Sequence, residues 1–294
     1  MPKPQITDVP FVNSVLHPTD MSPASQNAFA HALAISLLRK TDFTILHVSE
    51  SNDGRANFPA VRSTLEQWGL LEKGSSRSDV YEKLAIKVEK VKLCCSSNPA
   101  NEILEYIKLH PTDLLVLATE GRKDFPRWLH PSTAERIAAK SKMMTLFVHG
   151  TEDGFVSLKD GELRLHRILI PIDFYPNPRA AIKYAARAAS LMIEPVEIIL
   201  FHVGDSTETP TVEIPEVPSC SWKTVKSSGK VVEEITKAAN EYAINLIVMA
   251  TAGHEGFLDA LRGSVTEQVL RQVSCPVLAI PTDIALMNNK REGL

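Results

Sequence analysis

The sequence predicts an α/β protein built from two tandem doubly wound domains, each with a five-stranded parallel sheet of the Rossmann-like type. Two observations carry this prediction: short, uniformly apolar runs alternate with amphipathic stretches, and the whole pattern occurs twice along the chain. Strands that are buried on both faces of a parallel sheet are apolar throughout, whereas covering helices repeat their apolar residues at helical spacing. Parallel strands need right-handed crossovers, so helices are expected on both faces of each sheet.

Five blocks of sequence recur in the same order in the two halves of the chain. The blocks pair residues 11–20 with 167–173, 43–48 with 198–203, 114–121 with 246–253, 131–135 with 263–267, and 145–148 with 276–280. Self-similarity of this kind indicates a duplicated structural unit. We therefore expect one domain over residues 1–150 and a second over residues 165–294, joined near Gly150 to Arg164.

The helix that follows the first strand of each copy is predicted from its capping residues. Ser22-Pro23 in the first copy and Asn177-Pro178 in the second combine a capping side chain with a proline suited to the first helical position. Before the last strand, the pattern Ser-x-x-Glu occurs twice, at Ser132 with Glu135 and at Ser264 with Glu267. It is typical of a capping box at a helix start.

The two copies differ between their second and third strands. Residues 50–88 of the first copy show a helical pattern from Asp79 onward, whereas residues 204–221 of the second contain Pro210, Pro215 and Pro218. Proline has no backbone N–H and disrupts a helix interior. The second copy is therefore expected to lack one helix of the first and to have an irregular loop across residues 207–219.

Composition and charge exclude several classes of protein. The chain has 294 residues, 44% of them apolar, and a net charge of −3, so no global basic field would hold nucleic acid or an acidic membrane. No apolar run approaches the ~20 residues that a membrane-spanning helix needs, and residues 1–10 lack the pattern of a secretion signal. Four cysteines do not make a disulfide framework. We expect reduced thiols in a cytoplasmic protein.

Several features converge at the carboxyl ends of the strands of the second copy. Asp173 ends the first strand, Val203 ends the second, and Ala250–Gly253 leads to Gly263-Ser264 at the start of a helix. In a doubly wound sheet, ligands bind at this edge. Glycines let the backbone approach an anion, and a helix start offers free N–H groups. A carboxylate beside such a loop suits a ribose hydroxyl, so the combination predicts a nucleotide site.

These residues resemble the UspA family of universal stress proteins, whose ATP-binding members carry G-x2-G-x9-G-[S/T]. Here the motif reads Ala250-x2-Gly253-x9-Gly263-Ser264, with only the first glycine replaced. The runs Ile170-Pro-Ile-Asp173 and Leu200-Phe-His-Val203 carry the resemblance as well. It implies ATP as the ligand, with or without Mg²⁺, with Asp173 at the ribose and Val203 at the adenine. The residues expected to bind it are Pro171, Ile172, Asp173, Val203, Ala250, Gly253, Gly263, Ser264, Val265 and Thr266.

The first copy departs further from this motif. It reads Ala118-x2-Gly121-x9-Pro131-Ser132, and Pro131 has no N–H to offer a phosphate. Asp20 and Val48 keep the places that Asp173 and Val203 have in the second copy. We expect the first copy to bind nucleotide poorly or not at all.

The resemblance also implies a mode of assembly and of action. Single-domain members of the family pair through their last strands, so Met143–Val148 and Pro276–Ile280 are expected near a contact that makes the chain a pseudo-dimer. A further homodimer stays open. The expected function is nucleotide-controlled binding of protein partners under stress, without turnover and without nucleic acid or membrane as a partner.

Three alternatives remain beside this interpretation. His17, His47 and His130 fall near the ligand edge of the first copy, where they could hold Zn²⁺ or another small ligand, although the counterpart of His47, His202, suggests a structural role. The enzyme alternative finds neither a nucleophile elbow nor a Walker A loop in the sequence, and weak ATP hydrolysis or autophosphorylation stays open. A scaffold that binds no ATP could use the basic and aromatic residues Arg122, Lys123, Phe125, Arg127 and Trp128.

Overall fold

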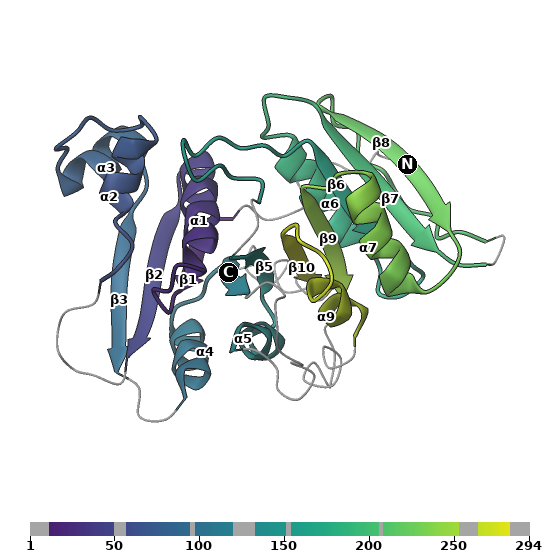
Figure 1. Ribbon diagram of the computed structural model, residues 1–294, viewed down its shortest axis with the longest axis horizontal. Coiled ribbons are helices and arrows are strands. Elements are labelled where there is room, and N and C mark those ends of the chain that lie inside the picture. The colour runs from purple at the N-terminus through teal and green to yellow at the C-terminus, as the bar shows by residue number, and fades with distance from the viewer. Residues whose placement is uncertain are drawn as a thin grey trace, which may run out of the picture. The chain divides into compact units, whose positions relative to one another are not determined.

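The computed structural model describes residues 12–49, 57–94, 98–119, 133–150, 154–205, 208–252 and 264–282. It has the predicted α/β architecture, with a parallel sheet and covering helices in each half of the chain (Figure 1). The chain divides into two compact units. The first unit contains Val12–Ser141 and Thr145–Leu163, and the second contains Arg164–Leu294 together with Lys142–Met144.

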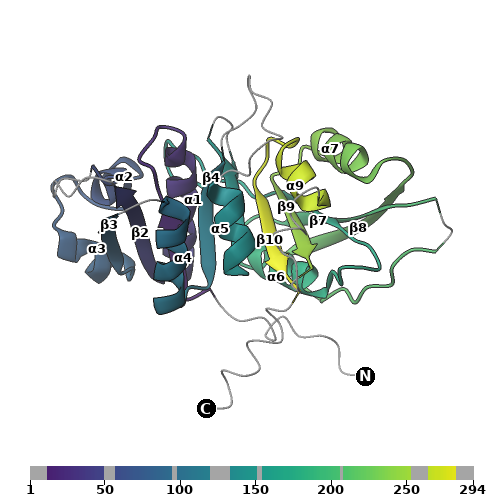
Figure 2. The same cartoon turned by 90° about the horizontal axis from the view of Figure 1, so that it is seen from below.

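The sheet of the first unit has its strands in the order β3-β2-β1-β4-β5. Residues at the centre of the sheet, such as Leu115 and Val116, are fully buried, as expected for strands covered on both faces. Figure 2 shows α1 on one face of this sheet and α4 and α5 on the other. The strands are β1 (Ser14–Pro18), β2 (Asp42–Ser49), β3 (Val88–Cys94), β4 (Leu114–Thr119) and β5 (Met144–His149). The helices are α1 (Ser25–Arg39), α2 (Val61–Gln67), α3 (Arg77–Leu84), α4 (Pro99–Leu109) and α5 (Thr133–Ser141).

The second unit repeats this topology with the strand order β10-β9-β6-β7-β8. In both units the order reverses beside the first strand, because β1 pairs with β2 and β4, and β6 pairs with β7 and β9. Helix α6 covers one face of this sheet, and α7 and α9 cover the other (Figure 2). The strands are β6 (Arg167–Pro171), β7 (Val196–Val203), β8 (Cys220–Ser227), β9 (Leu246–Thr251) and β10 (Val277–Pro281). The helices are α6 (Arg179–Ala189), α7 (Val231–Glu241) and α9 (Val265–Leu270).

The helix after the first strand begins later than its sequence predicts in both units. Helix α1 begins at Ser25 behind Ala24, which makes no side-chain cap. The expected cap, Ser22, instead donates its N–H to Asp20 Oδ1 at 2.9 Å, because the carboxylate closes a tight turn at this point. In the second unit Asn177 Oδ1 does accept the N–H of Arg179 at 2.9 Å, but α6 starts one residue after Pro178.

The predicted difference between the two copies is present and is larger than expected. The first unit has two short helices, α2 and α3, between its second and third strands, whereas the described residues 208–219 of the second unit contain no helix. Helix α3 begins at Arg77 rather than at Asp79, because Ser76 and Asp79 form a capping box. Helix α2 has only Val61 and Leu65 buried, so it has little apolar periodicity from which to predict it.

The chain that leaves the first unit folds back onto that unit. Val156 and Leu163 form an antiparallel bridge, and the turn between them packs on α2. Trp68 Nε1 donates a hydrogen bond to the carbonyl of Leu158 at 3.2 Å. Gly161, with a φ of +72°, lies directly against the Trp68 ring. Residues 154–163 therefore form a hairpin that is held by the helical insert of the first unit, which has no counterpart among the described residues of the second.

Each unit has one edge strand, which pairs with a neighbouring strand on one side only. These strands are β3 in the first unit and β8 in the second. Both carry lysines. Lys90 on β3 and Lys223 and Lys226 on β8 are exposed, and Lys92 on β3 is half-buried. Within the described residues, no helix is both long enough and apolar enough to span a bilayer.

Candidate functional site

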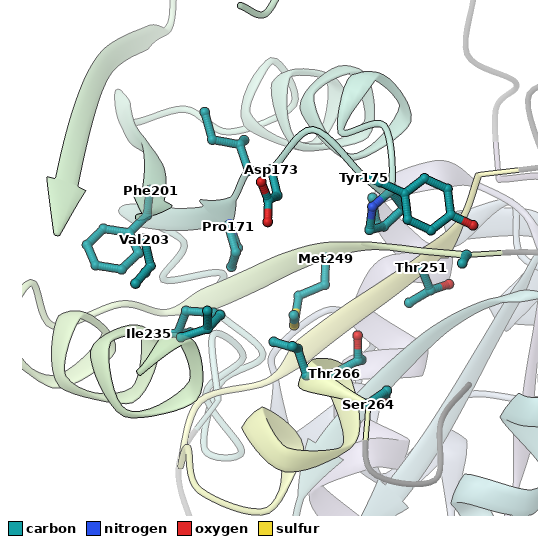
Figure 3. Close-up of a pocket in the computed structure, with 16 residues that line it drawn as sticks. Pro171, Asp173, Tyr175, Phe201, Val203, Ile235, Met249, Thr251, Ser264 and Thr266 are labelled. Carbon is teal, nitrogen blue, oxygen red and sulfur yellow. The ribbon is translucent and has the colours of Figure 1, made fainter. Parts of the chain in front are cut away.

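A cavity of about 220 Å³ opens at the carboxyl ends of β6, β7 and β9 in the second unit (Figure 3). This is the point at which the strand order reverses, where doubly wound sheets bind their ligands. The cavity is lined by Pro171, Ile172, Asp173, Tyr175, Pro176, Phe201, Val203, Val231, Ile235, Met249, Ala250, Thr251, Ala252, Ser264, Val265 and Thr266.

The structure brings most of the predicted site residues together around this cavity. They come from three separate stretches of chain: the end of β6, the end of β7, and the pair of segments that flank residues 253–263. The predicted residues that line the cavity are Pro171, Ile172, Asp173, Val203, Ala250, Ser264, Val265 and Thr266. Gly253 and Gly263 lie outside the described residues.

Sequence reasoning missed several lining residues, although periodicity could have found some of them. Phe201 lies two residues before Val203, so it faces the same side of β7. Val231 and Ile235 are one turn apart at the start of α7, which the motif does not include. Tyr175 lies in the loop after Asp173, and neither strand nor helix periodicity applies there.

The cavity has two chemically distinct ends. Figure 3 shows Phe201, Val203 and Ile235 at one end, and Tyr175 and Thr251 at the other. The first end is apolar, whereas the second carries hydroxyl groups. Among the described lining residues, Asp173 is the only side chain with a formal charge. The cavity therefore suits an elongated ligand with a flat apolar part and a polar part.

The position of Asp173 is fixed by hydrogen bonds of the neighbouring backbone. Ile172 donates its N–H to the carbonyl of Phe201 at 2.9 Å, and His202 Nδ1 hydrogen-bonds to the carbonyl of Ile172 at 3.1 Å. Asp173 Oδ1 accepts the N–H of Phe174 at 2.8 Å. Asp173 itself is exposed at the cavity, so its carboxylate is accessible to a ligand.

The first unit repeats this arrangement with another histidine. His47 Nδ1 hydrogen-bonds to the carbonyl of Thr19 at 2.8 Å, and Thr19 donates its N–H to the carbonyl of Leu46 at 2.8 Å. The same bond from a histidine to the residue before the aspartate thus occurs in both units. Both histidines hold the backbone at the carboxyl end of the first strand, which is a structural role.

Ser264 lies at the other side of the cavity, where α9 begins. Its hydroxyl oxygen accepts the N–H of Glu267 at 3.1 Å, which is one of the two hydrogen bonds of the predicted capping box. The carboxylate of Glu267 is buried and pairs with the guanidinium of Arg271 one turn later. The Ser264 hydroxyl oxygen is therefore oriented by the helix backbone, while its proton can be donated to a ligand.

The counterpart region of the first unit is only partly described. As expected, Asp20 follows β1 and Val48 lies near the end of β2. Asp20 Oδ1 accepts the N–H of Ser22. Gly121, Pro131 and Ser132 lie outside the described residues. The same holds for the proposed partner surface, whose residues are Arg122, Lys123, Phe125, Arg127 and Trp128.

The zinc alternative receives no support from the described histidines. No group of three or more His, Cys, Asp or Glu side chains placed to hold a metal ion occurs in the described part of the chain. His17 is fully buried and its Nδ1 hydrogen-bonds to the carbonyl of Val116 at 3.0 Å. Burial lowers the pKa of His17 from 6.5 to about 4. His130 lies outside the described residues.

Comparison with known proteins identifies relatives of this fold. A family model described as the universal stress protein family matches residues 12–149 and 215–281. No curated protein sequence matches the chain.

Three solved structures are similar over nearly the whole chain. A universal stress protein from Archaeoglobus fulgidus DSM 4304 is 19% identical with a TM-score of 0.63, covering 92% of this chain and 96% of its own. A protein of unknown function from Pseudomonas aeruginosa PAO1 is 16% identical with a TM-score of 0.61, covering 95% and 96%. A universal stress protein from Pseudomonas aeruginosa UCBPP-PA14, described as putative, is 15% identical with a TM-score of 0.58, covering 96% and 98%. At these identities the similarity concerns the fold alone.

Proposed function

We propose that this chain, which belongs to the universal stress protein family, binds an adenine nucleotide in its second unit and acts through that binding rather than through turnover. One observation carries the proposal. A single cavity collects the carboxylate of Asp173, the end of β7 at Val203, and the residues Ser264–Thr266. These are the segments that the resemblance to the family selects from the sequence alone.

The two ends of the cavity accommodate the two ends of a nucleotide. The adenine would lie at the apolar end, where Phe201, Val203 and Ile235 offer flat and branched surfaces. The phosphates would lie at the opposite end, where the hydroxyl group of Ser264 can donate a hydrogen bond.

Asp173 suits the sugar that joins these two parts. An ionised carboxylate only accepts hydrogen bonds, so it can bind the hydroxyls of a ribose but would repel a phosphate. Figure 3 shows Asp173 between the two ends of the cavity. Mg²⁺ would accompany ATP and lower the charge of the phosphates, which is useful in a cavity whose only described charge is negative.

Ala250 is the lining residue that departs from the glycine of the ATP motif, so its methyl group decides whether the ligand fits. It lines the cavity at the position where ATP-binding relatives of this motif have glycine, and its side chain adds one methyl group to the wall. The cavity of about 220 Å³ exists with this methyl group in place. We therefore propose that Ala250 narrows the site without closing it.

A binding role fits the lining better than a catalytic one. The described residues around the cavity include one carboxylate and several hydroxyl groups, but no histidine, cysteine or lysine that could serve as the base for a nucleophile. We propose that the ligand controls the binding of a protein partner. The rim supports this, because Phe174 and Tyr175 are 63% and 73% exposed beside the cavity.

We also propose a cytoplasmic location for the protein. Three of the four cysteines lie in the described residues, and Cys94, Cys220 and Cys275 are all free thiols. Thiols of this kind persist in a reducing compartment.

The experiment that tests the nucleotide proposal is calorimetric titration of the full chain with ATP, with and without Mg²⁺, and with GTP for comparison. Asp173→Asn keeps the shape of the side chain but removes its charge. Hydrogen bonds to charged groups contribute about 1.5–3 kcal/mol, so ATP affinity should fall roughly 10- to 100-fold.

The matched control is Asp20→Asn in the first unit, which should leave ATP affinity unchanged. Binding of ATP that survives Asp173→Asn, or that is lost on Asp20→Asn instead, would place the site elsewhere. Absence of ATP binding at millimolar concentration would reject the proposal.

A further inference from the structure

A threonine ends the fourth strand of both units in equivalent positions. Thr119 ends β4 and Thr251 ends β9. The carbonyl of Thr119 accepts the N–H of Gly150 at 3.1 Å, and the carbonyl of Thr251 accepts the N–H of Thr282 at 2.9 Å. Because these backbone bonds match, the residue before Gly150 corresponds to the residue before Thr282.

The residue at this neighbouring position differs between the units. In the first unit it is His149, and its Nδ1 lies 3.1 Å from Thr119 Oγ1 in a hydrogen bond. In the second unit it is Pro281, whose side chain can neither donate nor accept a hydrogen bond. The same hydroxyl group is therefore engaged by the protein in one unit and has no such neighbour in the other.

Thr251 Oγ1 has no hydrogen-bond partner within the part of the chain that the structure describes, although the residue is only 6% exposed. Buried hydroxyl groups are nearly always hydrogen-bonded, because an unpartnered one loses its bonds to water without replacement. An orphaned group of this kind in a native protein requires an explanation, and an absent ligand is one.

Thr251 is well placed to meet such a ligand. It lines the cavity at the end that also carries Tyr175, away from the apolar end at Phe201 and Val203 (Figure 3). Rotation about the Cα–Cβ bond by one staggered step moves Oγ1 into the position that Cγ2 held, while Cγ2 moves to the position of the β hydrogen. One side-chain rotation can thus present the hydroxyl group to the cavity without movement of the strand.

We propose that Thr251 is a specificity-determining residue of the cavity, and that its hydroxyl group donates a hydrogen bond to the phosphate of a bound nucleotide. This inference rests on the proposed function. It assigns a role to Thr251 Oγ1, an atom that the sequence motif does not specify. It also explains why the first unit would not use the equivalent hydroxyl group for a ligand, because the hydroxyl group of Thr119 is already hydrogen-bonded to His149.

The test is the variant Thr251→Val, which replaces the hydroxyl group by a methyl group of similar size. Calorimetric titration of the full chain would use AMP and adenosine as probes, since they differ only in the phosphate. Affinity for AMP should fall about tenfold or more, as expected for the loss of a hydrogen bond to a charged group. Affinity for adenosine should change by less than about twofold, and Thr251→Ser should restore AMP binding.

The melting temperature of the unliganded protein provides a second readout. It should stay the same or rise in Thr251→Val, because the variant removes a buried hydroxyl group that has no partner. The matched control is Thr119→Val, which removes the partner of His149. That variant should melt at a lower temperature and bind AMP with unchanged affinity.

Each other result overturns the inference. Equal AMP affinity in the wild type and Thr251→Val would mean that the hydroxyl group does not contact the ligand. An equal loss of AMP and adenosine affinity would place the contact on the nucleoside rather than the phosphate. If the wild type binds AMP and Thr251→Val does not weaken it, the proposed function survives and only this inference fails. If the wild type binds ATP but neither AMP nor adenosine, the proposed function survives and this inference fails. If it binds none of the three, both fail.

Discussion

The two units share a topology but differ in what they bury beside the first strand. When Asp20 is aligned with Asp173, His17 of the first unit corresponds to Ile170 of the second, and His31 corresponds to Tyr184. His17 and His31 are both fully buried. The first unit thus places imidazoles where the second has an aliphatic and a phenolic side chain.

These buried polar groups of the first unit are mostly bonded to one another or to the backbone. Asn27 Nδ2 donates to the carbonyl of His149 at 2.8 Å, and His31 Nδ1 hydrogen-bonds to the carbonyl of Asn27 at 2.8 Å. The Thr19 and Ser25 hydroxyl oxygens lie 3.0 Å apart. The first unit thus bonds one ring nitrogen of His17 and of His31 to its own backbone, whereas the second unit presents polar side chains such as Asp173 at a cavity.

The largest expected effect concerns acid stability, which should separate the two units. Burial lowers the pKa of His17 and of His31 from 6.5 to about 4. Both are therefore neutral in the native state at pH 5, whereas the unfolded chain protonates them. Their contribution to stability is complete above about pH 6.5 and is lost as the pH falls toward 4.

The change that tests this effect is the double variant His17→Ile with His31→Leu. Each histidine contributes about 1.4 kcal/mol per pH unit in this window, so the first unit should lose roughly 4 kcal/mol between pH 7 and pH 5 in the wild type. The variant should lose much less. Hydrogen exchange of the β4 amides reports the first unit, and the β9 amides serve as an internal control. The same pH dependence in wild type and variant would contradict the assignment.

A smaller effect is expected at the hairpin that only the first unit anchors with a helical insert. In Gly161→Ala the added methyl group would overlap the ring of Trp68, and the φ of +72° is unfavourable for alanine. The variant should be destabilised by roughly 3 kcal/mol in urea unfolding.

Gly74→Ala is the matched control for this variant. Gly74 has a similar φ of +82°, but a methyl group there would meet no atom within 4 Å. It should cost only about 1 kcal/mol, the cost of the backbone conformation. Equal losses in both variants would show that Trp68 does not hold the hairpin.

The smallest expected effect concerns the start of α3, a helix that the second unit lacks. Ser76 accepts the N–H of Asp79 and Asp79 accepts the N–H of Ser76. Ser76→Ala removes half of this capping box, and the free energy of unfolding should fall by about 1 kcal/mol. Chemical denaturation measures the change, and no loss would mean that α3 contributes nothing to the unit's cooperative unfolding.

Much of the fold could be predicted because each uniformly apolar run in the sequence is a strand that is buried on both faces of the sheet. Val116 and Val248 lie in corresponding blocks and are both fully buried in central strands. The helix boundaries were harder to predict, since they depend on which of several nearby polar groups forms hydrogen bonds with the backbone at the start of the helix. At Ser22 the carboxylate of Asp20 captured the serine's own N–H, and α1 began three residues after the expected cap.

The candidate site was predictable only where a motif marks it. Ser264 follows from the motif and Asp173 from its place at the end of the first strand in a family-like run, and both line the cavity. Tyr175 and Ile235 do not, because their position depends on how a loop and α7 pack over the end of the sheet. The role of Thr251 needed the structure as well. The hydroxyl group of Thr119 is hydrogen-bonded to His149, whereas that of Thr251 faces Pro281 at the equivalent position and has no partner among the described residues.

The lysines on the outermost strands β3 and β8 have a consequence for behaviour at high concentration. A strand at the end of a sheet exposes unpaired N–H and C=O groups, which can capture the same strand of another molecule. Lys223 and Lys226 on β8, like Lys90 and Lys92 on β3, place positive charge along these edges. Two such edges brought together would repel each other, so the lysines oppose edge-to-edge aggregation when the protein accumulates.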